Sequence, residues 1–309
     1  MGRIRASLVH ANPRFDLVGI VDPLPQTLSA LYQVESYATL SEAVDSQRLH
    51  GVIVSSPTST HTPLIQLASD HNLAVFTEKP VAATAEEIES LFAYADNIPL
   101  CCGFQRRFDP SYVAAAQANV GVPVYAHLFF ADHPMPPKEF LVQGGNIFMD
   151  LSAHDVDYIR NVLQDEVVSV YAKGTCSDPE LGVEDNATMV LHFRRGTVAT
   201  LFLSRGATYG YDQRCEIFGD QGHVSIGNVP EHTAVVSNAT GIHHARLQHS
   251  FPERFQEAFR LEMEAFASTI LDGVPWPVTA DDCVQVQRVA DAARLSSETG
   301  QVVVVDEMK

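Results

Sequence analysis

The segment GGNIFMDLSAHDVDYIRNVL, residues 144–163, carries a carboxylate and an imidazole four positions apart. Its apolar residues recur at helical spacing after two glycines, which predicts an amphipathic helix. On that helix Asp150 and His154 share a face, Asp157 continues the same stripe, and Asp155 points away from it. A neighbouring carboxylate tunes the pKa of an imidazole and selects its tautomer, as a general base near neutral pH requires. We therefore expect His154 to be the base and Asp150 to orient it or to hydrogen-bond the substrate.

Two other interpretations of this pair remain open. Aspartate and histidine four apart also occur together on solvated helix faces, where they have no catalytic role. Both residue types are zinc ligands as well. The sequence offers no third ligand with matching spacing, so we expect no metal site here.

A second candidate is Lys79, which follows the segment AVFTE at residues 74–78. This short apolar run is predicted to be a buried strand, and open α/β sheets bind their ligands at the carboxyl ends of their strands. An ammonium group there can hydrogen-bond the reacting oxygen and stabilise the negative charge that develops on it. The alternative is an ordinary loop lysine without a function.

The elements that must position these residues change character along the chain. Up to residue 104, short apolar strands alternate with helices, and Thr39–Glu42 and Thr84–Glu87 have capping-box spacing at two helix starts. This alternation predicts an α/β domain with a doubly wound parallel sheet of the Rossmann type. The predicted strands lie at residues 16–22, 51–56, 74–80 and 99–104, and the predicted helices lie at 3–12, from His61 and after Thr84.

From residue 105 onward, most segments have strand character. Runs of strands with a helix before them predict an α+β domain, in which helices cover one face of a large, mostly antiparallel sheet. Near the C-terminus, apolar residues at three- and four-residue steps from Phe255 to Ile270 predict a core-facing helix. We therefore predict two domains, residues 1–104 and 105–309.

Charge and composition exclude several classes of function. Of 309 residues, 46% are hydrophobic, which is ordinary for a globular protein. The formal net charge of −18 argues against nucleic acid and anionic membranes as partners. No apolar run is long enough to span a bilayer, no signal peptide is evident, and the five cysteines lack metal or redox spacing. These features predict a cytoplasmic enzyme.

The beginning of the chain contains part of a dinucleotide-binding fingerprint. Such a domain starts with a strand, G-x-G-x-x-G and a helix, and its second strand ends in an acid that binds the adenosine ribose. Asp22 supplies the acid and Gly2 fits the last glycine, but the first strand and first two glycines are not in the sequence. Because that strand is central, its loss should expose the edges of its two neighbours. We expect an internal methionine taken as the start or a trimmed chain, with true degeneration as the alternative.

Asp22 also bears on the choice of cofactor. An acid at this place repels the phosphate of NADP, and the following PLPQT offers no arginine to accept it, so the sequence favours NAD. A turn or helix-cap aspartate would look the same in the sequence.

Five motifs resemble those of the glucose-fructose oxidoreductase/inositol dehydrogenase family (Gfo/Idh/MocA), and the resemblance covers the chain from Gly2 onward. The segment SRGATYGYDQRCEIFGDQGHVSIGN at residues 204–228 is similar in particular to the inositol-oxidising branch. The motifs are SSPTSTH at 55–61, EKP at 78–80, GFQRRFDPSY at 103–112, GGNIFMDLSAHDVD at 144–157 and SRGATYGYDQRCEIFGDQGHVSIGN at 204–228. The resemblance implies an NAD-dependent enzyme with Lys79, Asp150 and His154 as catalytic residues. The implied cofactor-binding residues are Gly2, Asp22, Ser55, Ser56, Pro57, Thr58, His61, Glu78, Lys79 and Gln105.

Some of these roles have simpler alternatives. The hydroxyls and amides of residues 55–61 could equally cap the helix that follows them. Tyr209 and Tyr211, on one side of a strand or turn, could pack against the face of a cyclic polyol, or one of them could serve sheet packing alone. Asp132, on the loop before the catalytic helix, could accept hydrogen bonds from polyol hydroxyls.

The resemblance implies hydride transfer from a ring carbon of a cyclic polyol to NAD, with oxidation of myo-inositol to 2-keto-myo-inositol as the leading reaction. It also implies a homo-oligomer, dimer or tetramer, held by the exposed face of the second-domain sheet. One alternative is another sugar or polyol dehydrogenase of the same family. The other is a non-catalytic member that binds a sugar or a protein, because its phosphate-binding loop is incomplete. The expected substrate-binding residues are Lys79, Asp132, Asp150, His154, Tyr209 and Tyr211.

Overall fold

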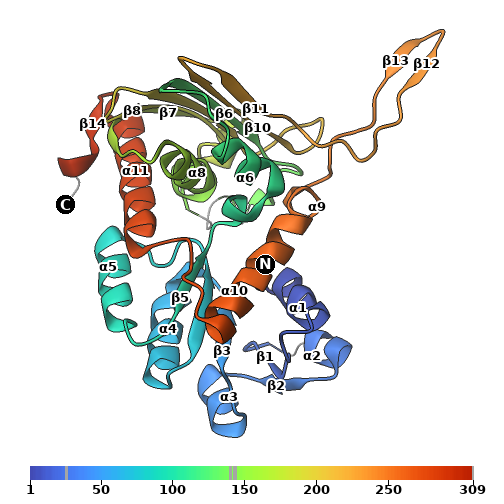
Figure 1. Cartoon of the computed structure of the whole chain (residues 1–309), viewed down its shortest axis with the longest axis vertical. Coiled ribbons are helices and arrows are strands. Elements are labelled where there is room, and N and C mark those ends of the chain that lie inside the picture. The colour runs from blue at the N-terminus through green and yellow to red at the C-terminus, as the bar shows by residue number, and fades with distance from the viewer. Residues whose placement is uncertain (25–26, 139–140, 142–144, 308–309) are drawn as a thin grey trace. The chain divides into compact units, whose positions relative to one another are not determined.

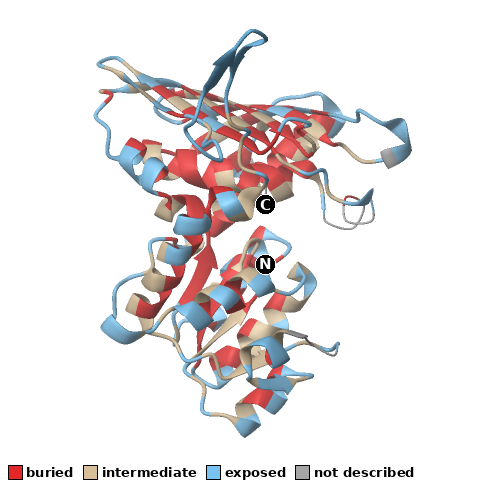
Figure 2. Ribbon diagram, turned by 90° about the vertical axis from the view of Figure 1, so that its right-hand side faces the viewer, coloured by how far each residue is buried: buried red, intermediate tan, exposed pale blue. Residues whose placement is uncertain are grey.

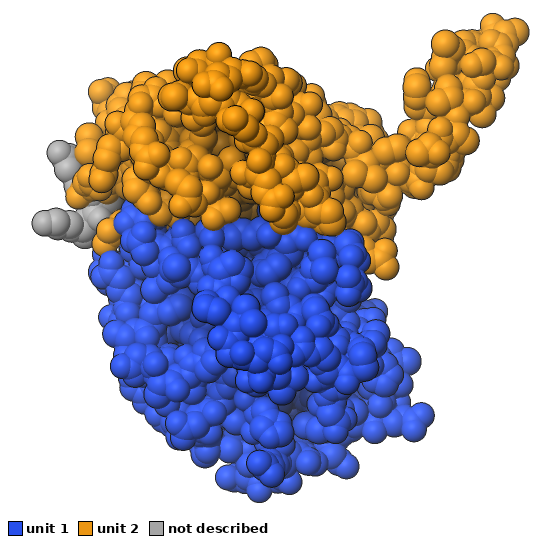
Figure 3. Space-filling model, viewed as in Figure 1, with its two compact units in different colours: residues 1–108, 257–285 blue, residues 109–256, 286–309 orange. Residues whose placement is uncertain are grey.

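The computed structural model describes residues 1–24, 27–138, 141 and 145–307, so Gly144 of the predicted helix lies outside the described residues. The chain forms two compact units, which Figure 3 shows in different colours. Unit 1 comprises residues 1–108 and 257–285, and unit 2 comprises residues 109–256 and 286–309. No helix within the described ranges has both the length and the apolar character needed to cross a membrane.

Unit 1 contains the alternating strands and helices that the sequence predicted, and both predicted threonine caps are confirmed. The hydroxyl of Thr39 accepts the Glu42 N–H, and that of Thr84 accepts the Glu87 N–H. The elements of this unit are α1 (Gly2–Ala11), β1 (Gly19–Val21), α2 (Thr27–Tyr32), β2 (Glu35–Tyr37), α3 (Leu40–Ser46), β3 (Gly51–Val54), η1 (Thr58–Thr60), α4 (His61–Asp70), β4 (Ala74–Glu78), α5 (Ala85–Tyr94), β5 (Leu100–Gly103), η2 (Gln105–Phe108), most of α10 (Gln256–Asp272) and the start of α11 (Ala280–Thr299).

All described strands of unit 1 are parallel, which confirms the predicted sheet type. β3, β4 and β5 form one sheet in that order, and β1 pairs with β2 in a second, separate sheet. Within the described part of the chain, β1 and β3 therefore each keep one unpaired edge. The sequence predicted these two exposed edges from the incomplete fingerprint.

The core of unit 1 lies between β4 and α10. Val75, Phe76 and Thr77 of β4 are fully buried, as the uninterrupted apolar run of a parallel strand requires. Met263 and Phe266 of α10 pack into the same cluster, and the ring centres of Phe76 and Phe266 lie 5.7 Å apart. Residues 257–285 thus complete the core of unit 1, whereas the sequence-based boundary assigned them to the second domain.

Unit 1 also extends beyond residue 104. The indole of Trp276 donates a hydrogen bond to the carbonyl oxygen of Cys102 (3.1 Å), and its ring centre lies 5.2 Å from that of Phe108. The guanidinium of Arg107 donates to the carbonyl oxygen of Pro277 (2.7 Å). These contacts hold the 3-10 helix η2 in unit 1, so the unit ends after Phe108.

Unit 2 is built on a seven-stranded mixed sheet with the order β11-β10-β6-β9-β8-β7-β14. β6 and β9 are parallel to each other and the remaining pairs are antiparallel, which confirms the predicted sheet type. Its elements are α6 (Pro110–Ala116), β6 (Pro123–Ala131), the π-helical turn η3 (Phe148–Ser152), α8 (Ala153–Leu163), β7 (Val167–Thr175), η4 (Pro179–Leu181), β8 (Asn186–Phe193), β9 (Val198–Ser204), β10 (Asp212–Gly219), β11 (His223–Ile226), β12 (Val236–Asn238), β13 (Gly241–His243), α9 (Phe251–Arg254), the rest of α11, β14 (Val303–Val304) and η5 (Val305–Glu307).

The two faces of this sheet differ. Helices α6, α8 and the second part of α11 lie on one face (Figure 1), where the Ser296 and Ser297 hydroxyls accept backbone N–H groups of β7. On the other face alternate residues stay partly exposed (Figure 2). Aromatic side chains line that face: the rings of Phe129 and Phe202 stack at 4.8 Å, and the guanidinium of Arg214 lies 4.2 Å from the Phe129 ring centre. One sheet face is therefore covered, and the other presents aromatic surface.

Replacing Phe266 by alanine should lower the free energy of unfolding by about 3–5 kcal/mol, because the change opens a cavity against Phe76. Leu271→Ala is the matched control on α10, since Leu271 is 61% exposed and should change stability by less than about 0.5 kcal/mol. Urea unfolding of both variants measures the difference. Equal losses would show that α10 does not pack as described.

Candidate active site

Predicted cofactor residues of unit 1 follow the carboxyl ends of its parallel strands. Asp22 follows β1, Ser55 and Ser56 follow β3, and Lys79 follows Glu78 at the end of β4. Ligands of open α/β sheets bind at this edge. Ser55, Ser56 and Lys79 thus follow strand ends of the β3-β4-β5 sheet, and Asp22 follows a strand of the separate β1-β2 pair.

The start of α1 fits the phosphates of such a cofactor. A Cβ atom on Gly2 would lie 3.8 Å from the Cβ of Ser55, so the start of α1 and the turn after β3 are neighbours. The Ser55 hydroxyl is buried and has no hydrogen-bond partner among the described residues. The first N–H groups of a helix lack helical acceptors and bind phosphate well. An orphaned hydroxyl beside such a helix start fits the pyrophosphate of NAD.

Asp22 has a local partner. Its Oδ1 accepts the N–H of Leu24 at 3.0 Å, as in a turn aspartate. The structure thus shows the turn role that the sequence left open, and the ribose role remains a proposal.

Residues 55–61 form a hydrogen-bonded turn, and His61 is its buried centre. Its Nδ1 lies 2.9 Å from the carbonyl oxygen of Pro80, and its Nε2 lies 3.0 Å from that of Ser56. The side chain is 1% exposed, so it joins the loops after β3 and β4. Both ring nitrogens face backbone carbonyls, so His61 has a structural role in this turn, and its cofactor contact stays a prediction.

The other cofactor candidates of unit 1 differ in exposure. Pro57 and Thr58 lie at the surface of the same turn, and Gln105 is buried in η2. Glu78 is 15% exposed, and its Oε1 accepts a hydrogen bond from Arg5 Nε at 2.7 Å. Lys79, the next residue, is half-buried.

In unit 2, the predicted catalytic helix begins with a π-helical turn, η3, and continues as α8. Asp150 lies in the π turn and His154 in the first turn of α8, and both are partly exposed. Single π turns inside helices are frequent at functional sites. Asp155 and Asp157 are buried, at 1% and 0% exposure, and belong to the interior. Asp150 and His154 are therefore an accessible pair, and Asp155 and Asp157 are a buried pair.

Arg205 holds Asp150, one member of the accessible pair, in place. Its guanidinium is 2% exposed and donates to Asp150 Oδ2 at 2.7 Å and to the carbonyl oxygen of Gly145 at 3.2 Å. The interaction fixes the carboxylate from one side and joins the end of β9 to the π turn. A charge-assisted bond of this kind orients the Asp150 carboxyl group.

Asp132 enters the same cluster because β6 and β9 are parallel. Ala131 pairs with Ser204, so both strands end at one edge and are followed by Asp132 and Arg205. The backbone N–H of Asp132 donates to the carbonyl oxygen of Ser204 at 2.8 Å. Burial, together with the charge of Asp150, raises the pKa of Asp132 to about 6, against the lowering effects of the His133 N–H and of Arg205.

Tyr209 and Tyr211 occupy different environments, contrary to the expectation that both lie on one side of the chain. Tyr209 is 56% exposed and donates to Asp212 Oδ2 at 2.7 Å, and burial with this carboxylate raises its pKa to about 12. Tyr211 is buried, donates to Gln213 Oε1 at 2.8 Å, and has its ring 5.6 Å from that of Phe130. The packing interpretation therefore fits Tyr211, and Tyr209 stays a candidate substrate residue.

Sequence reasoning missed Arg205 as a site residue, although a signal was present. An arginine directly after the apolar run TVATLFLS is placed at a strand end, where a buried guanidinium must find a carboxylate. Which carboxylate it finds depends on the strand order, which the local pattern does not contain.

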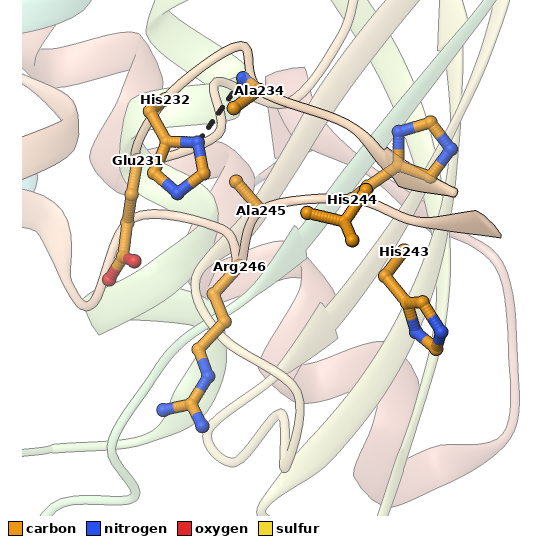
Figure 4. Close-up of a pocket in the computed structure, with 8 residues that line it drawn as sticks. Glu231, His232, Ala234, His243, His244, Ala245 and Arg246 are labelled. Atoms are coloured by element: carbon orange, nitrogen blue, oxygen red, sulfur yellow. Dashed lines mark hydrogen bonds between the residues drawn. The ribbon is translucent and has the colours of Figure 1, made fainter. Parts of the chain in front are cut away.

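A separate hollow of 330 Å³ lies at the base of the β12–β13 hairpin, away from these residues (Figure 4). His232, His243, His244 and Arg246 line it, but their side chains point in different directions. Ligand sites require polar groups that converge. No group of three or more His, Cys, Asp or Glu suited to a metal occurs in the described ranges, so we place no site in this hollow.

Comparison with known proteins identifies the family. A family model described as "Oxidoreductase family, NAD-binding Rossmann fold" matches residues 1–103, and one described as "GFO/IDH/MocA C-terminal domain" matches residues 114–225. Scyllo-inositol 2-dehydrogenase (NAD(+)) of Bacillus subtilis is 31% identical over 97% of this chain and 92% of its own length. The chain belongs to the Gfo/Idh/MocA oxidoreductase family. It is an NAD-dependent oxidoreductase with a Rossmann domain.

Solved structures agree with this assignment. Scyllo-inositol dehydrogenase from Lactobacillus casei, with bound NAD(H) and scyllo-inositol, is 28% identical, and the match covers 99% of this chain and 96% of that one with a TM-score of 0.92. A putative myo-inositol dehydrogenase from Sinorhizobium meliloti is 29% identical over 98% and 96% of the two chains, with a TM-score of 0.93. The myo-inositol 2-dehydrogenase of Thermotoga maritima is 29% identical over 93% of this chain and 89% of its own.

Replacing Arg205 by methionine should lower kcat/KM for NAD reduction about 10- to 100-fold, because Asp150 loses the donor that orients it. Arg205→Lys keeps the positive charge but loses the planar guanidinium group. Its kcat/KM should therefore lie between those of the wild type and Arg205→Met. Arg194→Met is the matched control. The Arg194 side chain is 61% exposed and forms only a long surface ion pair, of 3.7 Å, with Asp306. Steady-state kinetics of the three variants measure the effect. Wild-type kcat/KM in Arg205→Met would contradict the role of the pair.

Proposed function

We propose that this enzyme oxidises a ring hydroxyl of a cyclic polyol, with myo-inositol to 2-keto-myo-inositol as the leading reaction. The observation that carries the proposal is the Asp150–Arg205 pair, which orients a carboxylate on the helix of His154. Support comes from the names of relatives, which include myo- and scyllo-inositol dehydrogenases. The Lactobacillus casei relative holds scyllo-inositol together with NAD(H).

In this mechanism His154 removes the proton of the reacting hydroxyl. Asp150, held by Arg205, accepts a hydrogen bond from the imidazole or from a substrate hydroxyl and so stabilises the charged form of the base. In unit 1, Lys79 at the end of β4 is the proposed catalytic cation, because an ammonium group can stabilise negative charge on a substrate oxygen. A bound NAD would supply the hydride acceptor for this oxidation.

The polar groups of unit 2 suit a neutral polyol. Carboxylates accept hydrogen bonds, and a polyol ring offers many hydroxyl donors, so Asp132 and Asp150 are suitable partners. The guanidinium of Arg205 is already engaged by Asp150 and Gly145. These residues thus favour hydroxyl groups over an acidic substrate.

The open sheet face of unit 2 is the proposed surface for a homo-oligomer. It presents Tyr125 and Phe218, which are 37% and 40% exposed, beside the stacked Phe129 and Phe202. Exposed aromatic surface of this kind is enriched at protein interfaces.

Two alternatives keep specific support. Another sugar or polyol dehydrogenase would use the same base and carboxylates, because hydroxyl recognition is common to these substrates. A non-catalytic member of the family that binds a sugar or a protein is the other alternative. A panel of myo-inositol, scyllo-inositol and glucose, assayed with NAD, separates these possibilities, since a non-catalytic protein would reduce no NAD with any of them.

Replacing His154 by alanine should reduce kcat about 10²- to 10⁴-fold, because the variant lacks the proton acceptor. The dissociation constant for NAD, measured by calorimetry, should stay near the wild-type value. His244→Ala, an exposed histidine at the hairpin, is the matched control and should keep full activity. Loss of NAD binding in His154→Ala would contradict the assignment of His154 as the base.

The KM for the polyol should rise as pH falls through about 6, the value to which the pKa of Asp132 is raised. Above this pH the carboxylate accepts hydroxyl donors, and below it the group is protonated and loses that capacity. Asp132→Asn should have a high KM that does not change between about pH 5 and pH 7. A wild-type profile that Asp132→Asn reproduces would contradict substrate binding by this carboxylate.

A further inference from the structure

Arg5 of α1 is a buried cation shared by two carboxylates of unit 1. Its Nε donates to Glu78 Oε1 at 2.7 Å, and its NH1 lies 2.7 Å from Glu262 Oε2. The side chains of Arg5 and Glu262 are 2% and 0% exposed. The cluster therefore joins the first helix, the end of β4 and α10 through charged groups shielded from water.

The surrounding side chains leave the guanidinium little freedom. It lies 4.4 Å from the ring centre of Phe76 and 5.0 Å from that of Phe259. Gly103 of β5 pairs with Glu78 of β4. A Cβ atom added to Gly103 would lie 2.8 Å from the Phe76 ring and 3.4 Å from the side chains of Arg5 and Glu78. Only glycine fits at residue 103 without displacing the cluster. Arg5 is thus held between two rings, with Nε hydrogen-bonded to Glu78 and NH1 ion-paired with Glu262.

The cluster has more negative than positive charge when both carboxylates are ionised. The groups that face Glu262 are Arg5 from α1, Glu78 from β4 and Cys101 from β5. Complete burial, with a smaller effect of Glu78, raises the pKa of Glu262 to about 7 in spite of Arg5. The pKa of the Cys101 thiol is raised as well, chiefly by burial, so the thiol stays protonated. Burial thus favours the protonated form of Glu262, and the ion pair with Arg5 opposes this shift.

Glu78 connects this cluster to the ligand edge of the sheet. It is the last residue of β4, is 15% exposed, and precedes Lys79 in the chain. We propose that Glu262 is a positioning residue for Glu78: through Arg5 it fixes the Glu78 carboxylate and sets the charge at the cofactor edge, so that its ionised form shifts the ratio of affinities toward NAD⁺ and away from NADH. The inference rests on the proposed function, because it assumes that NAD binds at this edge.

The physical reason is the charge on the cofactor. The nicotinamide ring of NAD⁺ is positive and that of NADH is neutral. A positive ring at the carboxyl end of β4 favours the ionised form of Glu262, which leaves the cluster with one excess negative charge. Binding of NAD⁺ at pH 7 should therefore release, on average, a fraction of one proton from Glu262 per cofactor bound, and binding of NADH should release none.

Calorimetric titration of the full chain with NAD⁺ and with NADH, in two buffers of different ionisation enthalpy at about pH 7, tests this. The wild type should release a fraction of a proton with NAD⁺ and none with NADH. Glu262→Gln should release none with either, and its preference for NAD⁺ over NADH should fall about tenfold, because the excess charge is gone. Glu264→Gln is the matched control on α10: this residue is 39% exposed, pairs with Arg14, and should behave as wild type.

The outcomes separate this inference from the proposed function. A wild type that binds neither cofactor overturns both. A wild type that binds NAD⁺ without proton release, or a Glu262→Gln variant that keeps both release and preference, overturns the inference alone. The wild-type measurement needs no variant, so a folding defect in Glu262→Gln would not leave the question open. Arg5→Lys, which keeps the charge but cannot contact both carboxylates in one plane, should retain proton release but bind both cofactors more weakly.

Discussion

Unit 1 depends on one buried guanidinium that two carboxylates share. Arg5 is far from both of its partners in the sequence, 73 positions from Glu78 and further still from Glu262. Burying such a group is costly unless its partners are in place, and removing one partner would leave an uncompensated charge in the core. The consequence is that α1, the end of β4 and α10 have to meet in one arrangement. Together with the packing of Met263 and Phe266 against Phe76, this ion cluster holds a helix near the C-terminus in the N-terminal unit.

In unit 2, a parallel strand pair within a mostly antiparallel sheet brings together charged residues that are distant in the sequence. Because β6 and β9 run in the same direction, Asp132 and Arg205 follow two strand ends at one edge. Arg205 then reaches Asp150 in the π turn, 55 positions away in the chain. Asp132 and the Asp150–Arg205 pair at this edge are the groups on which the proposed recognition of hydroxyls rests. Each unit thus presents its chemistry where parallel strands end.

Much of this arrangement could be predicted from the sequence because it is local. Short apolar runs predicted the strands, threonine–glutamate spacing predicted two helix starts, and the spacing of Asp150 and His154 placed them on one helix. The exposed edges of β1 and β3 followed from the incomplete fingerprint.

Other features need contacts that periodicity does not contain. The placement of residues 257–285 in unit 1 depends on Met263 and Phe266 meeting Phe76, and the pattern of α10 shows only that this face is apolar. His61 looked like a ligand residue because it follows a strand, but its two ring nitrogens are occupied by carbonyls of two loops. Arg205 and the Arg5 cluster were missed because a lone arginine in a sequence does not reveal its carboxylate.

The central claim is that this chain transfers a hydride from a ring carbon of a cyclic polyol to NAD. The most direct measurement uses myo-inositol deuterated at C2, with NAD⁺ and the 309-residue chain, and follows the label into the nicotinamide by mass spectrometry. The account predicts deuterium in the reduced cofactor and a slower rate than with unlabelled substrate. If the chain binds NAD⁺ but no label is transferred from myo-inositol, and neither scyllo-inositol nor glucose supports reduction, the claim is contradicted.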